Sequence, residues 1–163
     1  MTTREYRQIE WDADIEDDCR QLIRLAVRED LERLYDWTTL SLIAEATPGR
    51  ARIEARKAGV IAGLPAAAVT LDEYDPDLQW QPLIEDGQRV AVGQTVAELS
   101  GSARSLLAVE RPLLNLLGHL SGIATLTRRF VDAVADTRAR IYDTRKTTPG
   151  WRRLEKYAVR CGG

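Results

Sequence analysis

The chain has 163 residues, 44% hydrophobic and 29% charged, so it can bury a core and need not be disordered. Its longest mostly apolar run, residues 59–69, is too short to cross a bilayer, and its polar, acidic start carries no visible secretory signal, so we expect a cytoplasmic protein that does not span a membrane. The net charge of −2 hides an asymmetry, because residues 1–100 carry 11 basic and 20 acidic side chains while residues 101–163 carry 12 and 5.

Residues 14–35 predict an amphipathic helix. Its apolar side chains recur at spacings of three and four, namely Ile15, Cys19, Leu22, Ile23, Ala26, Leu31 and Leu34. Acidic residues at its front suit the positive end of the helix dipole. We expect a turn at residues 36–39 and a short helix at 40–44 to follow.

Residues 47–103 predict a small β-rich layer. Ala51, Ile53 and Ala55 alternate with charged residues, as in a half-buried strand, and residues 59–63 predict a second, more buried strand. Turn signals and spaced valines between residues 86 and 99 predict two further short strands.

Residues 105–136 predict a return to helix with a broad apolar face. Pro112 is unfavourable inside a helix, so we expect it to begin a helix or to kink one. Ser121-Gly122 predicts a second bend.

The end of the chain predicts one βα unit. Arg140–Tyr142 has the composition of a short strand, and Thr148 and Pro149 suit the N-cap and first position of a helix. The helix would present an apolar side made of Trp151, Leu154, Tyr157, Ala158 and Cys161. A βα unit needs neighbouring strands, so we expect it to belong to a sheet or barrel.

The octet that joins this strand to this helix, Asp143–Gly150 (DTRKTTPG), has the composition of an anion site. The C-terminal end of a strand is where barrels and open α/β sheets place their sites. Arg145 and Lys146 are adjacent and can converge on one anion, and Thr144 adds a hydroxyl donor. A solvated surface loop is the alternative interpretation.

Other sites are less strongly indicated. Arginine dominates the basic residues, which favours carboxylate or phosphate ligands, and the aromatic residues of the basic half are not interleaved for nucleic-acid binding. Arg111, beside Pro112, is a candidate anion ligand. His119 lies in an apolar helical stretch and Cys161 lacks an evident base, so a structural role is favoured for both.

Several motifs together resemble quinolinate phosphoribosyltransferase, also called carboxylating nicotinate-nucleotide pyrophosphorylase. They are Glu110-Arg111, Leu114-Asn115, residues 119–125 (HLSGIAT), the octet 143–150 and residues 154–163 (LEKYAVRCGG), with earlier support from Glu29–Leu31, Thr38-Thr39, Arg50-Ala51 and Gly59–Gly63. The resemblance runs in order along nearly the whole chain.

The resemblance implies an α/β fold class. An α+β N-terminal domain with a small β-sheet layer would occupy residues 1–113, and residues 114–163 would form a helix and the first βα unit of an irregular α/β barrel. It further implies a head-to-tail homodimer that builds each active site from both subunits. The implied reaction joins quinolinate to phosphoribosyl pyrophosphate with Mg²⁺, and yields nicotinate mononucleotide, pyrophosphate and CO₂ in de novo NAD synthesis.

The same resemblance implies roles for individual residues. Arg111 would bind a quinolinate carboxylate across the dimer interface, and Thr144 and Arg145 would bind quinolinate in the barrel. Lys146, the candidate catalytic residue, would lie between quinolinate and the phosphoribosyl donor. Chains of the family continue beyond the position of Gly163 with segments that hold the donor and the metal, so we expect an N-terminal portion that is inactive alone.

Three alternatives remain. The chain could be a non-enzymatic binding or oligomerisation module derived from that enzyme, or a relative that acts on another base. Residues 86–101 also resemble the strand–turn pattern of lipoyl and biotinyl carrier domains. No lysine lies between Lys57 and Lys146, so that hairpin has no modification site and the carrier interpretation is disfavoured.

Overall fold

The computed structural model describes residues 8–30 and 37–163. Along the chain its elements are α1 (Ala13–Asp30), α2 (Trp37–Leu42), β1 (Pro48–Glu54), β2 (Gly59–Val60), α3 (Leu64–Tyr74), β3 (Gln79–Pro82), β4 (Arg89–Val90), β5 (Thr95–Ser102), α4 (Ala103–Ala133) and α5 (Arg152–Cys161). The expected α/β class, with helices and a small sheet layer, is confirmed.

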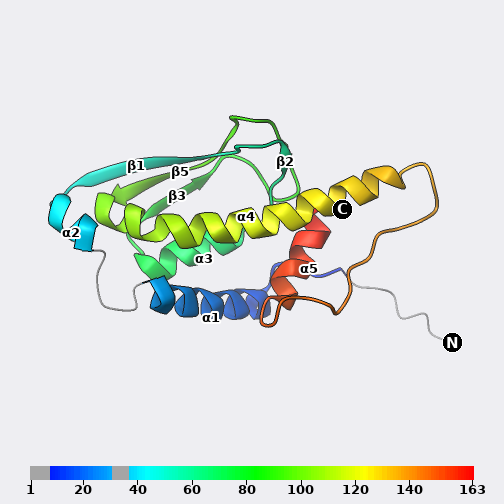
Figure 1. Ribbon diagram of the computed structural model, residues 1–163, viewed down its shortest axis with the longest axis horizontal. Coiled ribbons are helices and arrows are strands. Elements are labelled where there is room, and N and C mark those ends of the chain that lie inside the picture. Colours follow the sequence, from blue (N-terminus) through cyan, green and yellow to red (C-terminus); the bar gives the residue numbers. More distant parts are fainter. Residues whose placement is uncertain (1–7, 31–36) are drawn as a thin grey trace.

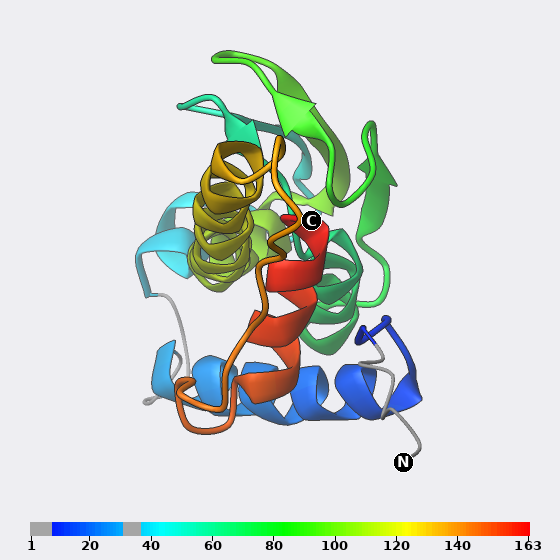
Figure 2. The ribbon, with the colours of Figure 1, turned by 90° about the vertical axis from the view of Figure 1, so that its right-hand side faces the viewer.

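The sheet and the helices form layers (Figures 1 and 2). The antiparallel order β1-β5-β3 makes a three-stranded sheet, and β2 and β4 pair separately. The sheet lies on one side of α4 and α3, and α1 lies below these helices. Ile53 and Ala55 pack against the core and Arg52 and Glu54 are exposed, as predicted, but Ala51 is exposed as well, so the alternation holds only in the second half of the predicted strand.

The predicted N-terminal helix is confirmed as α1, and its predicted members Leu31 and Leu34 lie outside the described residues. Its buried Ile15, Cys19 and Ile23 join a core cluster with residues of α3, α4 and α5. Arg20 ties the exposed side of α1 to α3 through Asp72 at 2.7 Å and Glu73 at 2.9 Å. The turn expected at residues 36–39 is wrong from Trp37 onward, because α2 already begins there.

Residues 64–74 correct the sequence analysis, which placed them within the β-rich layer. They form α3, because Gly63 has a left-handed backbone, with φ of 103°, and Pro65 follows at the helix start. Asp86 caps the helix from a distant turn, since its carboxylate accepts hydrogen bonds from Gly63 N at 2.8 Å and Leu64 N at 3.0 Å. Burial raises the pKa of Asp86.

The long helix is confirmed as α4, and it runs without a break past both positions where an interruption was expected. It begins after Ser102, whose hydroxyl caps it, so no helix starts at Pro112, and it continues through Ser121-Gly122. The Ser121 hydroxyl accepts a hydrogen bond from Ala62 N at 3.1 Å, and the Thr125 hydroxyl accepts one from Val60 N at 2.9 Å. In addition to the pairing of β2 with β4, the SGIAT stretch therefore supplies hydrogen-bond partners to the backbone of β2 and of the residues after it.

Only the helix of the predicted C-terminal βα unit is present. Residues 140–142 form no strand, because a strand requires a hydrogen-bonded neighbour and no described strand pairs with them. The helix is α5, but Thr148 and Pro149 do not begin it, because Gly150 has a φ of 83° and interrupts the helical path. The chain turns there, with Trp151 N donating to Thr148 O at 3.0 Å.

The predicted apolar side of α5 is confirmed. Leu154, Tyr157, Ala158 and Cys161 are buried against α1 and α4. The Tyr157 hydroxyl also donates to the Asp86 carboxylate at 2.8 Å, which joins α5 to the capped end of α3. None of the helices in residues 8–30 and 37–163 is long and apolar enough to cross a membrane.

Candidate anion site

The octet Asp143–Gly150 lies in the loop that leaves α4 and returns along α5 towards α1 (Figures 1 and 2). Its first residue, Asp143, is nearly buried and pairs with Lys156 at 2.5 Å. Its later part contacts α5 twice, because Arg152 Nε donates to Thr147 Oγ1 at 3.3 Å and Thr148 N donates to Glu155 Oε2 at 3.2 Å. The octet is therefore packed against the first turn and a half of α5.

Glu155 also joins the octet to α4. Its second oxygen, Oε1, lies 3.1 Å from His119 Nε2, and the His119 ring meets Trp151 edge to face at 5.0 Å. Although burial opposes it, hydrogen bonds from Thr148 and His119 hold the pKa of Glu155 below its ordinary value. His119 therefore joins α4 to α5 through Glu155 and Trp151. Its side chain is 42% exposed and is not buried in the apolar face of α4.

The three candidate ligands in the octet are exposed. The Thr144 hydroxyl accepts a hydrogen bond from Lys146 N at 3.1 Å and closes a short turn around Arg145. Within the described part of the chain, neither the guanidinium of Arg145 nor the ammonium of Lys146 has a hydrogen bond or ion pair. Two adjacent cations without an acidic partner can pair with an added anion.

Arg111 lies on a different element. It is exposed on the third turn of α4, eight residues before His119, which is about 12 Å along the helix axis at the usual rise. Its neighbour Glu110 lines a hollow of about 320 Å³ between β1 and α4. The structure thus brings Thr144, Arg145 and Lys146 together in one turn and places Arg111 apart from them.

The sequence analysis missed Glu155 as a site residue. The signal that could have found it is the spacing of Arg152, Glu155 and Lys156, which puts three charged residues on one face of the helix that follows the octet. The contact of Glu155 with His119 joins residues 36 positions apart, so spacing within the helix could not reveal it.

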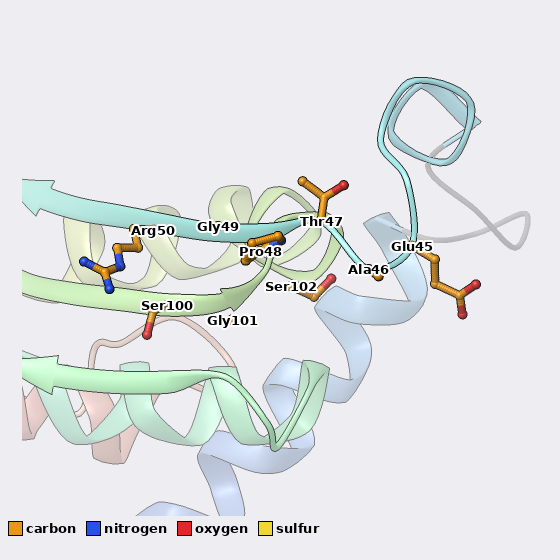
Figure 3. Close-up of a pocket in the computed structure, with 9 residues that line it drawn as sticks. All are labelled: Glu45, Ala46, Thr47, Pro48, Gly49, Arg50, Ser100, Gly101 and Ser102. Carbon is orange, nitrogen blue, oxygen red and sulfur yellow. The ribbon is translucent and has the colours of Figure 1, made fainter.

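Two larger hollows lie on the sheet. One of them, of about 700 Å³, lies where β1 begins and β5 ends (Figure 3), with Arg50 and Ser100 on paired strands and Glu45 on the approach to β1. The other, of about 750 Å³, lies on the exposed face of the sheet between β1 and β3. Neither is lined by the octet or by Arg111, so the predicted anion chemistry lies outside these hollows.

Two further kinds of site concern metal ligands and the thiol of Cys161. No group of three or more metal-ligating side chains occurs among the residues that the structure describes. Cys161 is buried, and burial raises the pKa of its thiol to about 12. A thiol protonated at neutral pH is a poor nucleophile.

The fold and the octet define an α/β protein with a preformed cationic loop. The model of the family "Quinolinate phosphoribosyl transferase, N-terminal domain" matches residues 36–121, and the model of its C-terminal domain matches residues 123–163. The chain belongs to the quinolinate phosphoribosyl transferase family, as its motifs predicted. The two matched ranges meet inside α4.

Curated relatives agree. A protein of Synechocystis sp. called a probable carboxylating nicotinate-nucleotide pyrophosphorylase is 50% identical over 83% of this chain and 45% of its own length. The carboxylating nicotinate-nucleotide pyrophosphorylase of Mycobacterium leprae is 46% identical over 90% of this chain and 52% of its own. The chain therefore spans about half the length of these relatives.

Solved structures show the same fold. The nicotinate-nucleotide pyrophosphorylase of Francisella tularensis matches with a TM-score of 0.90 at 34% identity, over 98% of this chain and 56% of that one. NadC from Streptococcus pyogenes matches with a TM-score of 0.87 at 39% identity, over 94% of this chain and 53% of that one.

Proposed function

We propose that this chain takes part in the transfer of a phosphoribosyl group to quinolinate, in de novo NAD synthesis in the cytoplasm. Quinolinate and phosphoribosyl pyrophosphate would yield nicotinate mononucleotide, pyrophosphate and CO₂. The observation that carries the proposal is the octet, which presents Arg145 and Lys146 without acidic partners among the described residues. The name of the matched family, quinolinate phosphoribosyl transferase, supplies the substrate class.

The chemistry of the reactants fits this loop. Quinolinate is a dianion, and its donor carries a phosphate and a pyrophosphate, so a shared site must be cationic. The planar guanidinium of Arg145 can bind a carboxylate in bidentate fashion, with the Thr144 hydroxyl as a further donor. Lys146 would act as a point charge between the two substrates, where pyrophosphate departs. Positioning and charge stabilisation would then supply most of the rate enhancement.

Arg111 and Mg²⁺ have separate places in the proposal. Since Arg111 lies apart from the octet, we assign it to the octet of a second copy of the chain, as a carboxylate ligand. Mg²⁺ would arrive with the phosphates of the donor. The described residues contain no metal-ligating cluster, so they do not form its site by themselves, and no step is assigned to the ion.

The proposal is tested by comparing the chain with a fusion protein, in which the chain is followed by the remaining C-terminal part of the Synechocystis relative. We expect the fusion protein to form nicotinate mononucleotide from quinolinate, the donor and Mg²⁺. We expect no detectable product from the 163 residues alone, because they span about half of each relative. Chromatographic detection of product measures both.

Other outcomes would contradict these expectations. Preferential use of nicotinate by the fusion protein would indicate a relative that acts on another base. A folded fusion protein without phosphoribosyl transfer to any pyridine carboxylate would favour a binding or oligomerisation module. Turnover by a homogeneous 163-residue sample would show that the octet-bearing half suffices.

We further propose that the chain forms a homodimer or a larger homo-oligomer. The apolar face of α5 is buried, so it does not carry this association. Four exposed apolar residues lie on α4, where Leu107, Leu114, Leu126 and Phe130 are each at least 42% exposed. Such faces favour association.

Light scattering at micromolar concentration should therefore give a mass of at least twice 18.3 kDa. Replacing Leu126 and Phe130 with glutamate should lower the measured mass towards the 18.3 kDa of a single chain. A homogeneous monomer of the unmodified chain at these concentrations would overturn the association.

A further inference from the structure

The octet is held mainly by side chains of α5. Its residues lie in no helix or strand, and among the described residues its backbone–backbone hydrogen bonding is limited to that from Trp151 N to Thr148 O. Arg152, Glu155 and Lys156 lie on one face of α5, since their spacing is three and four. They contact Thr147, Thr148 and Asp143, respectively.

We propose that Glu155, braced by His119, is a positioning residue that fixes the octet in the conformation presenting Arg145 and Lys146. The part of this inference that concerns quinolinate rests on the proposed function. The part that concerns the conformation of the octet rests on the contacts of Glu155 alone.

Glu155 is the best placed of the three for this task. Its side chain is 13% exposed, and its two oxygens contact different elements, one the octet at Thr148 N and the other α4 at His119. The carboxylate lies in the first turn of α5, where the helix dipole favours a negative charge. A charge-assisted hydrogen bond to Thr148 N is stronger than one between neutral groups.

Contacts on both sides of Arg145 and Lys146 restrict the positions that these two cations can take. Lys156 holds Asp143, and Glu155 holds Thr148, so the backbone of residues 144–147 is limited to paths that join two fixed points. The turn from Lys146 N to Thr144 Oγ1 then sets the direction of Arg145. An anion binding to this loop need not pay the entropy of ordering it.

Amide hydrogen exchange of residues 144–151 in the 163-residue chain tests the conformational part without substrate. Glu155→Ala should speed exchange at the Thr148 amide by about tenfold or more, because this amide loses its charge-assisted hydrogen bond to the carboxylate. Glu155→Gln should largely preserve protection, because its amide still offers an acceptor to Thr148 N. Arg153→Ala is the matched control, since Arg153 lies on the same helix but pairs with Asp14 and Asp18 of α1.

His119→Ala provides a second variant, because its ring is partly exposed and its removal leaves the core intact. It should also speed exchange at Thr148, by about twofold to fivefold. The effect is smaller because this variant weakens the hydrogen bond from Thr148 N to Glu155 without removing it. Unchanged exchange in both folded variants would overturn the inference. If Glu155→Ala does not fold, the His119→Ala result decides.

Steady-state kinetics of the fusion protein test the functional part. Glu155→Ala should raise the KM for quinolinate about tenfold and change the donor KM less than about threefold, with Glu155→Gln close to the parent. Equal loss for both substrates would indicate a general structural role and would contradict positioning. If the unmodified fusion protein does not use quinolinate, the proposed function fails, and hydrogen exchange alone decides how the octet is held.

Discussion

Arg145→Lys in the fusion protein is expected to raise the KM for quinolinate about tenfold to a hundredfold, with a smaller effect on the donor KM. Lysine keeps the charge but lacks the planar fork that pairs with a carboxylate through two hydrogen bonds. A lost charge-assisted hydrogen bond costs about 1.5–3 kcal/mol, which corresponds to that range. The side chain is exposed and has no partner among the described residues, so the change should leave the fold intact.

Two further variants sharpen the measurement. Lys146→Ala should raise both KM values and lower kcat, because the proposal puts this ammonium between the two substrates. Arg138→Lys is the matched control, an exposed arginine of the same loop outside the octet, and should change no kinetic constant beyond about twofold. If the quinolinate KM of Arg145→Lys lies within about twofold of the parent value, the octet does not bind the carboxylate and is a solvated surface loop.

Gly162→Ala is expected to destabilise the 163-residue chain by about 1–3 kcal/mol. Gly162 has ordinary right-handed helical angles, with φ of −73°, so backbone strain plays no part. The added Cβ would lie 2.5 Å from Thr127 Cβ and 2.6 Å from Ala124 O, both on α4. Because one of these is a backbone atom of a long helix, α5 itself would have to move away.

Gly118→Ala provides the matched control for the same substitution. Apart from its chain neighbours and the backbone of its own helical turns, nothing lies within 4 Å of the position of its Cβ, and the residue is in the interior of α4. Helix propensity alone should then stabilise the chain by about 0.5–1 kcal/mol. Urea unfolding gives both values, and similar stability changes for the two variants would show that α5 does not pack closely on α4.

Much of the candidate site could be predicted from local sequence. Arg145 and Lys146 are adjacent, and threonines flank them, so the anion-binding composition is visible without any contact between distant residues. The positioning role of Glu155 could not be predicted in this way. It depends on the packing of α5 against α4, which brings His119 Nε2 to 3.1 Å from Glu155 Oε1. The role of SGIAT likewise depends on β2, about 60 residues earlier in the chain, lying beside α4.

The sequence by itself determined α1, most of α4, the alternation in the second half of β1, the chemistry of the octet and membership of the family, because each follows from a repeating period or a contiguous motif. The tertiary structure decided that residues 64–74 form α3, since an apolar run with no clear period suits either a helix or a strand until Asp86 caps its first amides. It also decided that residues 140–142 are not a strand and that α5 begins only after Gly150. A strand exists only where a neighbour accepts and donates its backbone hydrogen bonds, and a helix begins only where the preceding backbone permits it, so neither could be settled from the residue types alone.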